Sequence, residues 1–453
     1  MTEKLSGLGA IHPSRILHRA GATPVAAVGG NGIHLHLADG RTIIDGSGGA
    51  AVACIGHGDP RVIEAIAAQA SKVAYTHTAF FTTEPAEELA QILLDGEPGG
   101  LSHAFSSGSE GAEAAIKLAR QYYIERGERQ RTRFIARRQS YHGTTLGALS
   151  AGGNMMRRRL YEPILSPAFS HVSPCFAYRF KRNDEMEEEY VGRLIEELDE
   201  EFHRLGPEMV AAFVAEPVVG ATAGCVAALP GYFPRIRELC NRYGALLIFD
   251  EVMCGMGRTG TMHAWEQEGA TPDIQIIAKG LGGGYQPIGG ILIHRRIVEA
   301  IRRGSGAFLH GQTYQAHPVA CAAALAVQRI IRDDNLLASV RDGAPVLERA
   351  LIERFGNHPQ VGDVRGRGLF WALEFVTDRA SKEVFDPKLR FAERVKEEAI
   401  ARGLAVYPMN GTIDGTLGEH VIVAPPYIAT AADIEAVVQR LGEAVDAGRA
   451  PLQ

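Results

Sequence analysis

The chain of 453 residues lacks the features that mark several large classes of protein. Its six cysteines form no C-x-x-C pair and have no zinc-ligand spacing, which excludes a disulfide scaffold and predicts a reduced, cytoplasmic protein without a metal site. No apolar run is long enough to span a bilayer, and the first 21 residues have no signal-peptide core. The net charge of only −6 argues against a polyanion binder. We therefore expect no nucleic-acid or membrane partner.

Glycine, by contrast, is abundant. The chain has 52 glycines in 453 residues, against a typical share of about 7%. The hydrophobic share of 46% is ordinary for a globular protein, so disorder does not explain the excess. Turns, helix ends and close approach of the backbone to a ligand are the remaining uses. Basic clusters at 126–138 and 157–159 are interpreted as solvated helix faces and loop ends.

Between about residues 100 and 300, short apolar strands alternate with helices. The clearest strand, 245–249, is uninterrupted and runs into Asp250. Such runs are typical of strands buried on both faces, so the pattern predicts an α/β fold with a mostly parallel central sheet and helices on both faces. The later part of the chain, with strands near 370–375, 405–408 and 421–424, predicts a smaller α+β domain.

Two polar residues follow strands of this predicted sheet, where parallel sheets bind their ligands. Lys279 stands between a short strand and the glycines of 280–284, and a lysine with a lowered pKa can form a Schiff base or act as a base. Asp250 would match a protonated ring nitrogen. Taken alone, Lys279 could equally be a surface charge, and Asp250 a helix cap or a structural ion-pair partner.

Two further segments complete a cofactor pattern. Residues 106–110 (SSGSE) form a strand-to-helix turn that offers an anion site, with simple helix capping as the alternative. Tyr141 begins a YHG loop and could stack on a flat ring, or merely pack. The chain has neither a Walker A loop nor a dinucleotide fingerprint. Lysine, aspartate, helix N-terminus and aromatic ring together indicate pyridoxal 5'-phosphate (PLP), which serves as an electron sink.

Over roughly residues 33–438 the sequence resembles the class III (omega) aminotransferases of PLP fold type I. The most specific stretches are LLIFDEVMCGMGRTG at 246–260 and AKGLGGGYQPIGG at 278–290. Shorter matches are SGSE at 107–110, YHG at 141–143, AEPV at 215–218 and HGQTYQAHP at 310–318. We predict a large PLP-binding domain at 61–330, and a small domain that joins segment 1–60 to residues 331–453.

The resemblance implies a role for each matching residue. Lys279 would bond to the cofactor and carry the proton, Asp250 would face the ring nitrogen, and Glu216 would lie on the substrate side. Thr313 would reach the cofactor phosphate of a neighbouring subunit, which implies a homodimer. The predicted catalytic residues are thus Lys279, Asp250 and Glu216, and the predicted cofactor-binding residues are Ser107, Gly108, Ser109, Tyr141, His142, Glu216, Asp250, Val252, Met253, Lys279 and Thr313.

The reaction implied is a ping-pong transfer of an amino group from an amine or omega-amino acid to a keto acid. The residues after Asp-Glu-Val are Met-Cys-Gly (253–255), which favours the amine:pyruvate enzymes. Those enzymes usually carry an arginine shortly before an Ala-Pro-Pro segment, and here residues 410–427 contain none. Arg258, Arg365 and Arg367 are the candidates for binding substrate carboxylate, although a structural role explains each of them as well.

Several alternatives stay open at this point. Other class III reactions are amino-alcohol phosphate lyase, aminomutase and decarboxylase chemistry, and a PLP-binding regulatory protein with little turnover is a third hypothesis. The physiological amine, its stereochemistry, the choice between pyruvate and 2-oxoglutarate, and the choice between dimer and tetramer do not follow from the sequence.

Overall fold

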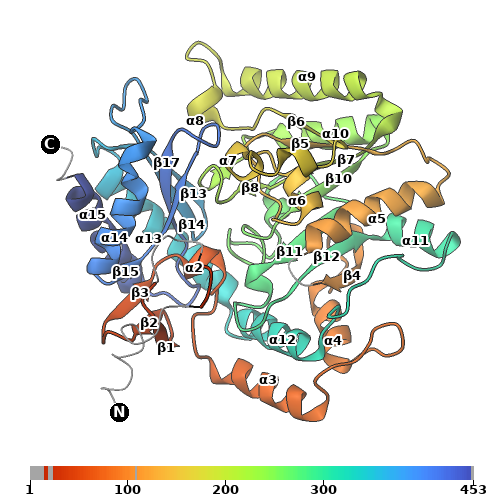
Figure 1. Cartoon of the computed structure of the whole chain (residues 1–453), viewed down its shortest axis with the longest axis horizontal. Coiled ribbons are helices and arrows are strands. Elements are labelled where there is room, and N and C mark those ends of the chain that lie inside the picture. The colour runs from red at the N-terminus through yellow and green to blue at the C-terminus, as the bar shows by residue number, and fades with distance from the viewer. Residues whose placement is uncertain (1–14, 19–23, 108–109, 450–453) are drawn as a thin grey trace.

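The computed structural model describes residues 15–18, 24–107 and 110–449 (Figure 1). Its largest sheet has seven strands in the order β4-β12-β11-β10-β7-β5-β6. Only β12 of these strands runs against its neighbours, so the prediction of a mostly parallel sheet is confirmed. The strands are β4 (Leu101–Ser107), β5 (Arg133–Arg137), β6 (Phe169–Val172), β7 (Val210–Ala215), β10 (Leu246–Asp250), β11 (Ile274–Ala278) and β12 (Gly289–His294).

Helices cover both faces of this sheet, because alternate side chains of each strand point to opposite sides. In β10, Leu246 and Ile248 pack in one cluster with α5 (Gly111–Glu125). Leu247 and Phe249 pack in another, with α9 (Glu187–Leu205) and α10 (Tyr232–Tyr243). The uninterrupted apolar run in the sequence thus reflects burial on two sides.

A second region combines the two ends of the chain (Figure 1). Its antiparallel sheet contains β13 (Val361–Arg367), β14 (Phe370–Phe375), β17 (Glu419–Val423) and β16 (Tyr407–Asn410). Beside it, β1 (Ala27–Asn31), β2 (His34–Leu37) and β3 (Thr42–Asp45) form a sheet that β15 (Leu404–Ala405) completes, parallel to β3. This pairing brings the N-terminal and C-terminal segments into one sheet. The division into segment 1–60, a large domain at 61–330 and a small domain at 331–453 stays a prediction.

The remaining elements connect these sheets or cover them. None of the helices within the described ranges is long and apolar enough to cross a membrane. The remaining elements are α2 (Gly48–Ala51), α3 (Pro60–Lys72), α4 (Glu84–Leu93), α6 (Leu146–Ala151), α7 (Met155–Arg158), α8 (Ala177–Phe180), α11 (Arg295–Arg303), α12 (Pro318–Asp333), α13 (Leu336–Phe355), α14 (Phe391–Ala401) and α15 (Ala431–Arg449), with the short strands β8 (Val218–Val219) and β9 (Val226–Ala227).

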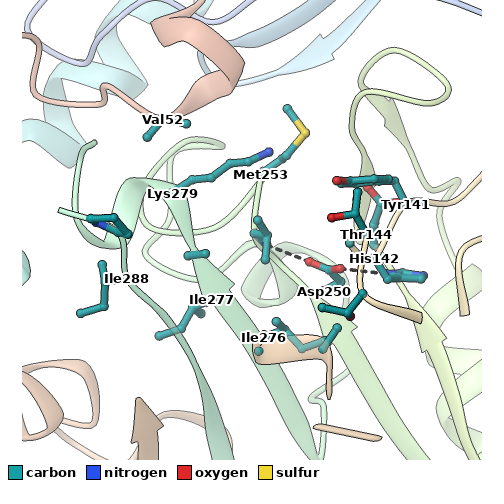
Figure 2. A pocket seen from close by; sticks show the side chains of 18 of the residues that line it. Val52, Tyr141, His142, Thr144, Asp250, Met253, Ile276, Ile277, Lys279 and Ile288 are labelled. Atoms are coloured by element: carbon teal, nitrogen blue, oxygen red, sulfur yellow. Dashed lines mark hydrogen bonds and ion pairs between the residues drawn. The ribbon is translucent and has the colours of Figure 1, made fainter. Parts of the chain in front are cut away.

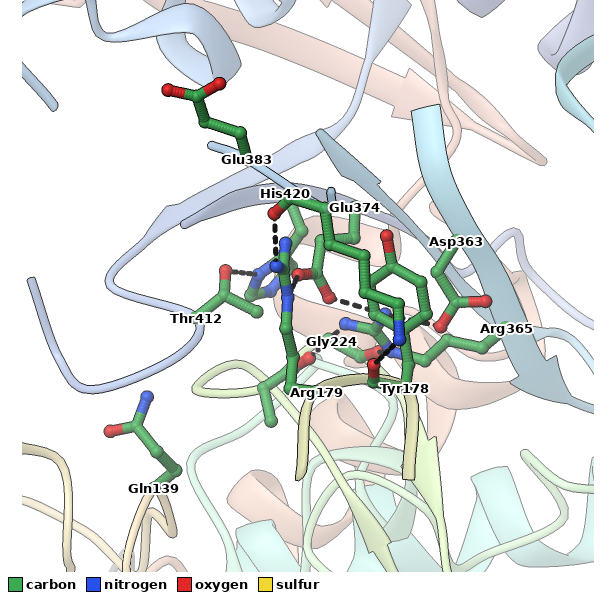
Figure 3. A network of polar contacts seen from close by, with 12 residues as sticks. Gln139, Tyr178, Arg179, Gly224, Asp363, Arg365, Glu374, Glu383, Thr412 and His420 are labelled. Atoms are coloured by element: carbon green, nitrogen blue, oxygen red, sulfur yellow. Dashed lines mark hydrogen bonds and ion pairs between the residues drawn. The ribbon is translucent and has the colours of Figure 1, made fainter. Parts of the chain in front are cut away.

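A buried ionic network joins the two regions (Figure 3). Arg365 of β13 pairs with Asp363 at 2.8 Å and with Glu374 at 2.6 Å, and its Nε donates to the Gly224 carbonyl at 2.7 Å. Arg179 of α8 also pairs with Glu374, which is fully buried. Each charge is therefore compensated, which a buried ion requires.

The interpretation of the basic clusters as solvated faces is wrong for three arginines. Arg131, Arg137 and Arg158 are 7%, 1% and 8% exposed. Each donates to backbone carbonyls, as Arg158 does to those of Ser150 and Gly152 at 2.7 and 2.6 Å. A guanidinium has five N–H donors, so it can satisfy several carbonyls that no strand or helix pairs.

Replacing Arg365 by Met is expected to lower the free energy of unfolding by about 3 kcal/mol or more, because the buried Glu374 carboxylate loses a partner. The control is Lys72→Met, which breaks an exposed pair with Glu84 and is expected to cost about 0–1 kcal/mol. Urea unfolding followed by circular dichroism measures both. Equal midpoints for the two variants would contradict a supporting role for the network.

Candidate active site

A cavity of about 410 Å³ lies at the carboxyl ends of β10 and β11. This is where parallel sheets bind their ligands, and the volume is in the usual range for a small-molecule site. It is lined by Val52, Gly111, Ala112, Tyr141, His142, Gly143, Thr144, Thr145, Glu216, Asp250, Val252, Met253, Ile276, Ile277, Ala278, Lys279, Gly284, Gln286, Pro287 and Ile288. Seven of the residues predicted from the sequence therefore meet in one place.

Asp250 stands at the end of β10 and is held from two sides (Figure 2). Its Oδ2 lies 2.8 Å from Nδ1 of His142, and its Oδ1 accepts the Val252 N–H at 3.0 Å. The His142 side chain is fully buried. The sequence placed His142 at the cofactor but did not predict its contact with Asp250, because 108 positions separate the two residues.

Lys279 follows β11 directly and points into the same cavity (Figure 2). Its φ is +47°, a left-handed conformation that costs a residue other than glycine about 1–3 kcal/mol. The turn is held closed because Gly282 and Gly283 both donate to the Lys279 carbonyl, at 3.1 and 2.9 Å. From α12, Gln328 donates to the next two carbonyls, at 3.1 and 2.9 Å. The strained turn is thus fixed by its surroundings, and with it the direction of the amine.

Burial and the nearby carboxylates shift the pKa of Lys279 in opposite directions. Burial lowers the pKa of Lys279 to about 8, while the nearby carboxylates of Asp250 and Glu216 act to raise it. Burial also raises the pKa of Glu216. The Glu216 carboxylate accepts the N–H groups of Tyr141 at 3.1 Å and Gly220 at 2.9 Å. A lysine amine whose pKa is near neutral can act as nucleophile and as base.

Other residues of the cavity lining suit a ligand that has a flat ring and an anionic group. Tyr141 and Val252 both line it, and so do Gly111 and Ala112 at the N-terminus of α5, an end that attracts anions. A Cβ at Gly111 would lie only 3.0 Å from the Gly290 carbonyl oxygen, so glycine allows this close packing. With the amine of Lys279 and the carboxylate of Asp250, these groups fit PLP.

Four other predicted cofactor-binding residues do not line this cavity within the described part of the chain. Gly108 and Ser109 lie outside the described residues, and for Ser107 the backbone is described, where it pairs with Gly289 in the sheet. Thr313 is exposed on a turn and is not part of this chain's own cavity lining.

The three arginines considered for the substrate carboxylate are bound elsewhere. Arg258 is 1% exposed and donates to the carbonyls of Leu369, at 3.1 Å, and Pro425. Arg367 pairs with Glu268, and Arg365 belongs to the network of Figure 3. All three therefore have structural roles.

The chain is similar to known proteins over nearly its whole length. The family described as Aminotransferase class-III matches residues 17–445. An uncharacterized aminotransferase of Schizosaccharomyces pombe is 51% identical over 93% of this chain and 92% of that protein. A putrescine–pyruvate aminotransferase of Pseudomonas aeruginosa is 33% identical over 92% of this chain and 89% of that protein. The crystal structure of an omega-transaminase from Pseudomonas jessenii in complex with PMP has a TM-score of 0.88 and 32% identity, over 94% of this chain and 93% of that chain.

The lowered pKa of Lys279 predicts that, without cofactor, its amine reacts half-maximally near pH 8 and reaches a plateau above that pH. An ordinary lysine, with a pKa of about 10.4, would still gain reactivity above pH 10. Brief labelling with acetic anhydride, read by mass spectrometry, measures this, with the Lys72 peptide as internal reference. Asp250→Asn should move the midpoint lower, because it removes a charge that raises the Lys279 pKa. A midpoint near 10 would contradict the analysis.

Proposed function

Because the chain belongs to the class III aminotransferases, which are PLP-dependent transaminases, we propose that it moves an amino group from a primary amine or omega-amino acid to pyruvate by a ping-pong mechanism, with PLP bound at Lys279. The observation that carries this proposal is the convergence of Lys279 and Asp250 on one cavity, with the Lys279 pKa near 8.

Each residue of the cavity has a separate role in the proposed reaction. When bound, PLP supplies an electron sink. The neutral Lys279 amine takes a proton from the substrate carbon and returns it at the end of the transfer. The Asp250 carboxylate keeps a negative charge facing the ring nitrogen, and His142 holds that carboxylate in place at 2.8 Å. Tyr141 and Val252, which both line the cavity, would pack on the faces of the bound ring, and Glu216 would lie on the substrate side.

Pyruvate is proposed as acceptor on two grounds. The residues Met253, Cys254 and Gly255 after Asp-Glu-Val favour the amine:pyruvate enzymes, and a relative from Pseudomonas aeruginosa is named a putrescine–pyruvate aminotransferase.

We also propose that the enzyme is a homodimer in which Thr313 completes the partner's site. Thr313 precedes Tyr314, whose ring lies 6.1 Å from that of Tyr75. Exposed apolar side chains that gather on a surface mark a protein interface. The exposed large apolar residues in segments 75–81 and 309–314 are Tyr75, Phe80, Phe81, Leu309 and Tyr314, which are 40%, 76%, 66%, 77% and 70% exposed.

Wild-type protein loaded with PLP should form alanine from pyruvate with at least one amine of a panel that includes diamines and omega-amino acids. Lys279→Ala should lose the visible absorption band of the loaded protein and at least about 10²–10⁴-fold in rate, because no other group moves the proton. Asp250→Asn should keep PLP more readily than activity, since the phosphate contacts are intact. Release of ammonia or phosphate without a keto acid would instead indicate a lyase.

The dimer proposal predicts that two inactive variants complement each other. Lys279→Ala removes the amine from a subunit's own site, whereas Thr313→Asp places a negative charge beside the partner's phosphate. Co-expressed, they should recover about a quarter of wild-type activity, since half of the dimers are hybrids and each has one intact site by twofold symmetry. If Thr313 acted within its own subunit, each subunit of the hybrid would carry one defect in its own site. Co-expression of the two variants would then recover no activity.

A further inference from the structure

An unused arginine lies beside the active site. Arg157 belongs to the short helix α7, and its guanidinium carbon lies 4.5 Å from the centre of the Tyr141 ring. That ring lines the cavity together with Lys279. The positive charge of Arg157 is also among the charges that lower the pKa of Lys279. The contact with Tyr141 therefore places this charge directly behind the lining of the cavity that contains Lys279.

Within the described part of the chain, no carboxylate neutralises the charge of Arg157. The side chain is half-buried, and its Nε is shut off from solvent without a hydrogen-bond partner. Among the residues that the structure describes, no carboxylate lies within ion-pair distance of Arg157, whereas the next residue, Arg158, pairs with Glu162. A partly buried cation without an anion is unfavourable, so its presence indicates that an anionic ligand completes the pair.

The adjacent arginines, Arg158 and Arg159, differ from Arg157 in their surroundings. Arg158 is buried and donates to the carbonyls of Leu149, Ser150 and Gly152, which gives it a structural role. Arg159 is exposed. Of three consecutive arginines, one therefore supports the loop, one lies in solvent, and Arg157 alone packs against Tyr141, a residue of the cavity lining.

The surroundings of α7 hold Arg157 in this position. Asn154 caps the helix by accepting the Arg157 N–H at 3.3 Å, and its Nδ2 donates to Gln139 at 3.3 Å. Gln139 in turn donates to the Gly411 carbonyl at 2.6 Å. Gly415 packs so tightly on α7 that a Cβ there would lie 2.8 Å from the Met156 nitrogen. The loop 411–418 contains no arginine, but its contacts hold α7, the helix that carries Arg157, in place.

We propose that Arg157 binds the carboxylate of the keto-acid acceptor. A guanidinium forms two parallel hydrogen bonds with a carboxylate, which fixes the orientation of the acid as well as its position. The Tyr141 ring would support the guanidinium from one side while the acceptor carbonyl faces Lys279. An amine donor without a carboxylate would not use this contact. The proposal rests on the proposed aminotransferase function and assigns its acceptor-binding residue.

The kinetic test compares an acceptor that has a carboxylate with one that lacks it, pyruvate against propanal. Arg157→Met keeps the length of the side chain and removes the charge, so kcat/KM for pyruvate should fall about 10- to 100-fold, mainly through KM. The fall with propanal should be at least tenfold smaller. Arg157→Lys should recover part of the loss, and the control Arg159→Met should match wild type. Equal losses with both acceptors would mean a structural role and would overturn the proposal.

A binding test separates this proposal from the proposed function. L-Lactate has the carboxylate of pyruvate but no carbonyl that can react, and its binding to the PLP-loaded protein can be followed by calorimetry. Arg157→Met should weaken lactate binding at least tenfold, whereas Arg159→Met should not. Unchanged binding in Arg157→Met, or no binding to wild type, would overturn the carboxylate site even if transamination is observed. Lactate binding that depends on Arg157, without transamination of any substrate, would overturn the proposed function alone.

Discussion

The active site depends on one electrostatic balance, a lysine amine buried beside two carboxylates. Burial by itself disfavours the charged form of Lys279, and the negative charges of Asp250 and Glu216 favour it. The outcome is a pKa of about 8, which lies between the value in water and that of an unpaired buried amine. The amine can therefore change protonation state near neutral pH, which is the property that the proposed roles of nucleophile and proton carrier require.

The fold maintains this balance by restricting each partner. Asp250 is fixed by His142 and the Val252 N–H, and Lys279 is fixed by a left-handed turn that Gln328 supports from α12. The amine and the carboxylate follow neighbouring parallel strands, so the sheet itself sets their separation. A side chain that was free to move would be solvated more of the time, and its pKa would return toward the value in water.

Arginine has opposite uses in this protein. Arg158, Arg258 and Arg365 are held by carbonyls or carboxylates of the protein, and they join loops or the two regions of the chain. The Nε of Arg157 has no such partner among the described residues, and its guanidinium packs on Tyr141 of the cavity lining. The residue type does not distinguish the two uses, because both need a half-buried or buried guanidinium. The presence or absence of a protein acceptor distinguishes them, and it is a property of the folded chain.

The sequence by itself determined the parallel α/β architecture and the strand ends that carry Asp250 and Lys279, because burial on two faces requires uninterrupted apolar runs such as 245–249. The resemblance carried by residues 246–290 also identified the family. Only the tertiary structure decided that His142 supports Asp250, that Arg158 is buried, and that Arg157 packs on Tyr141 at the cavity. These contacts join segments that are distant along the chain or depend on which carbonyls remain unpaired after folding, and no local pattern encodes either.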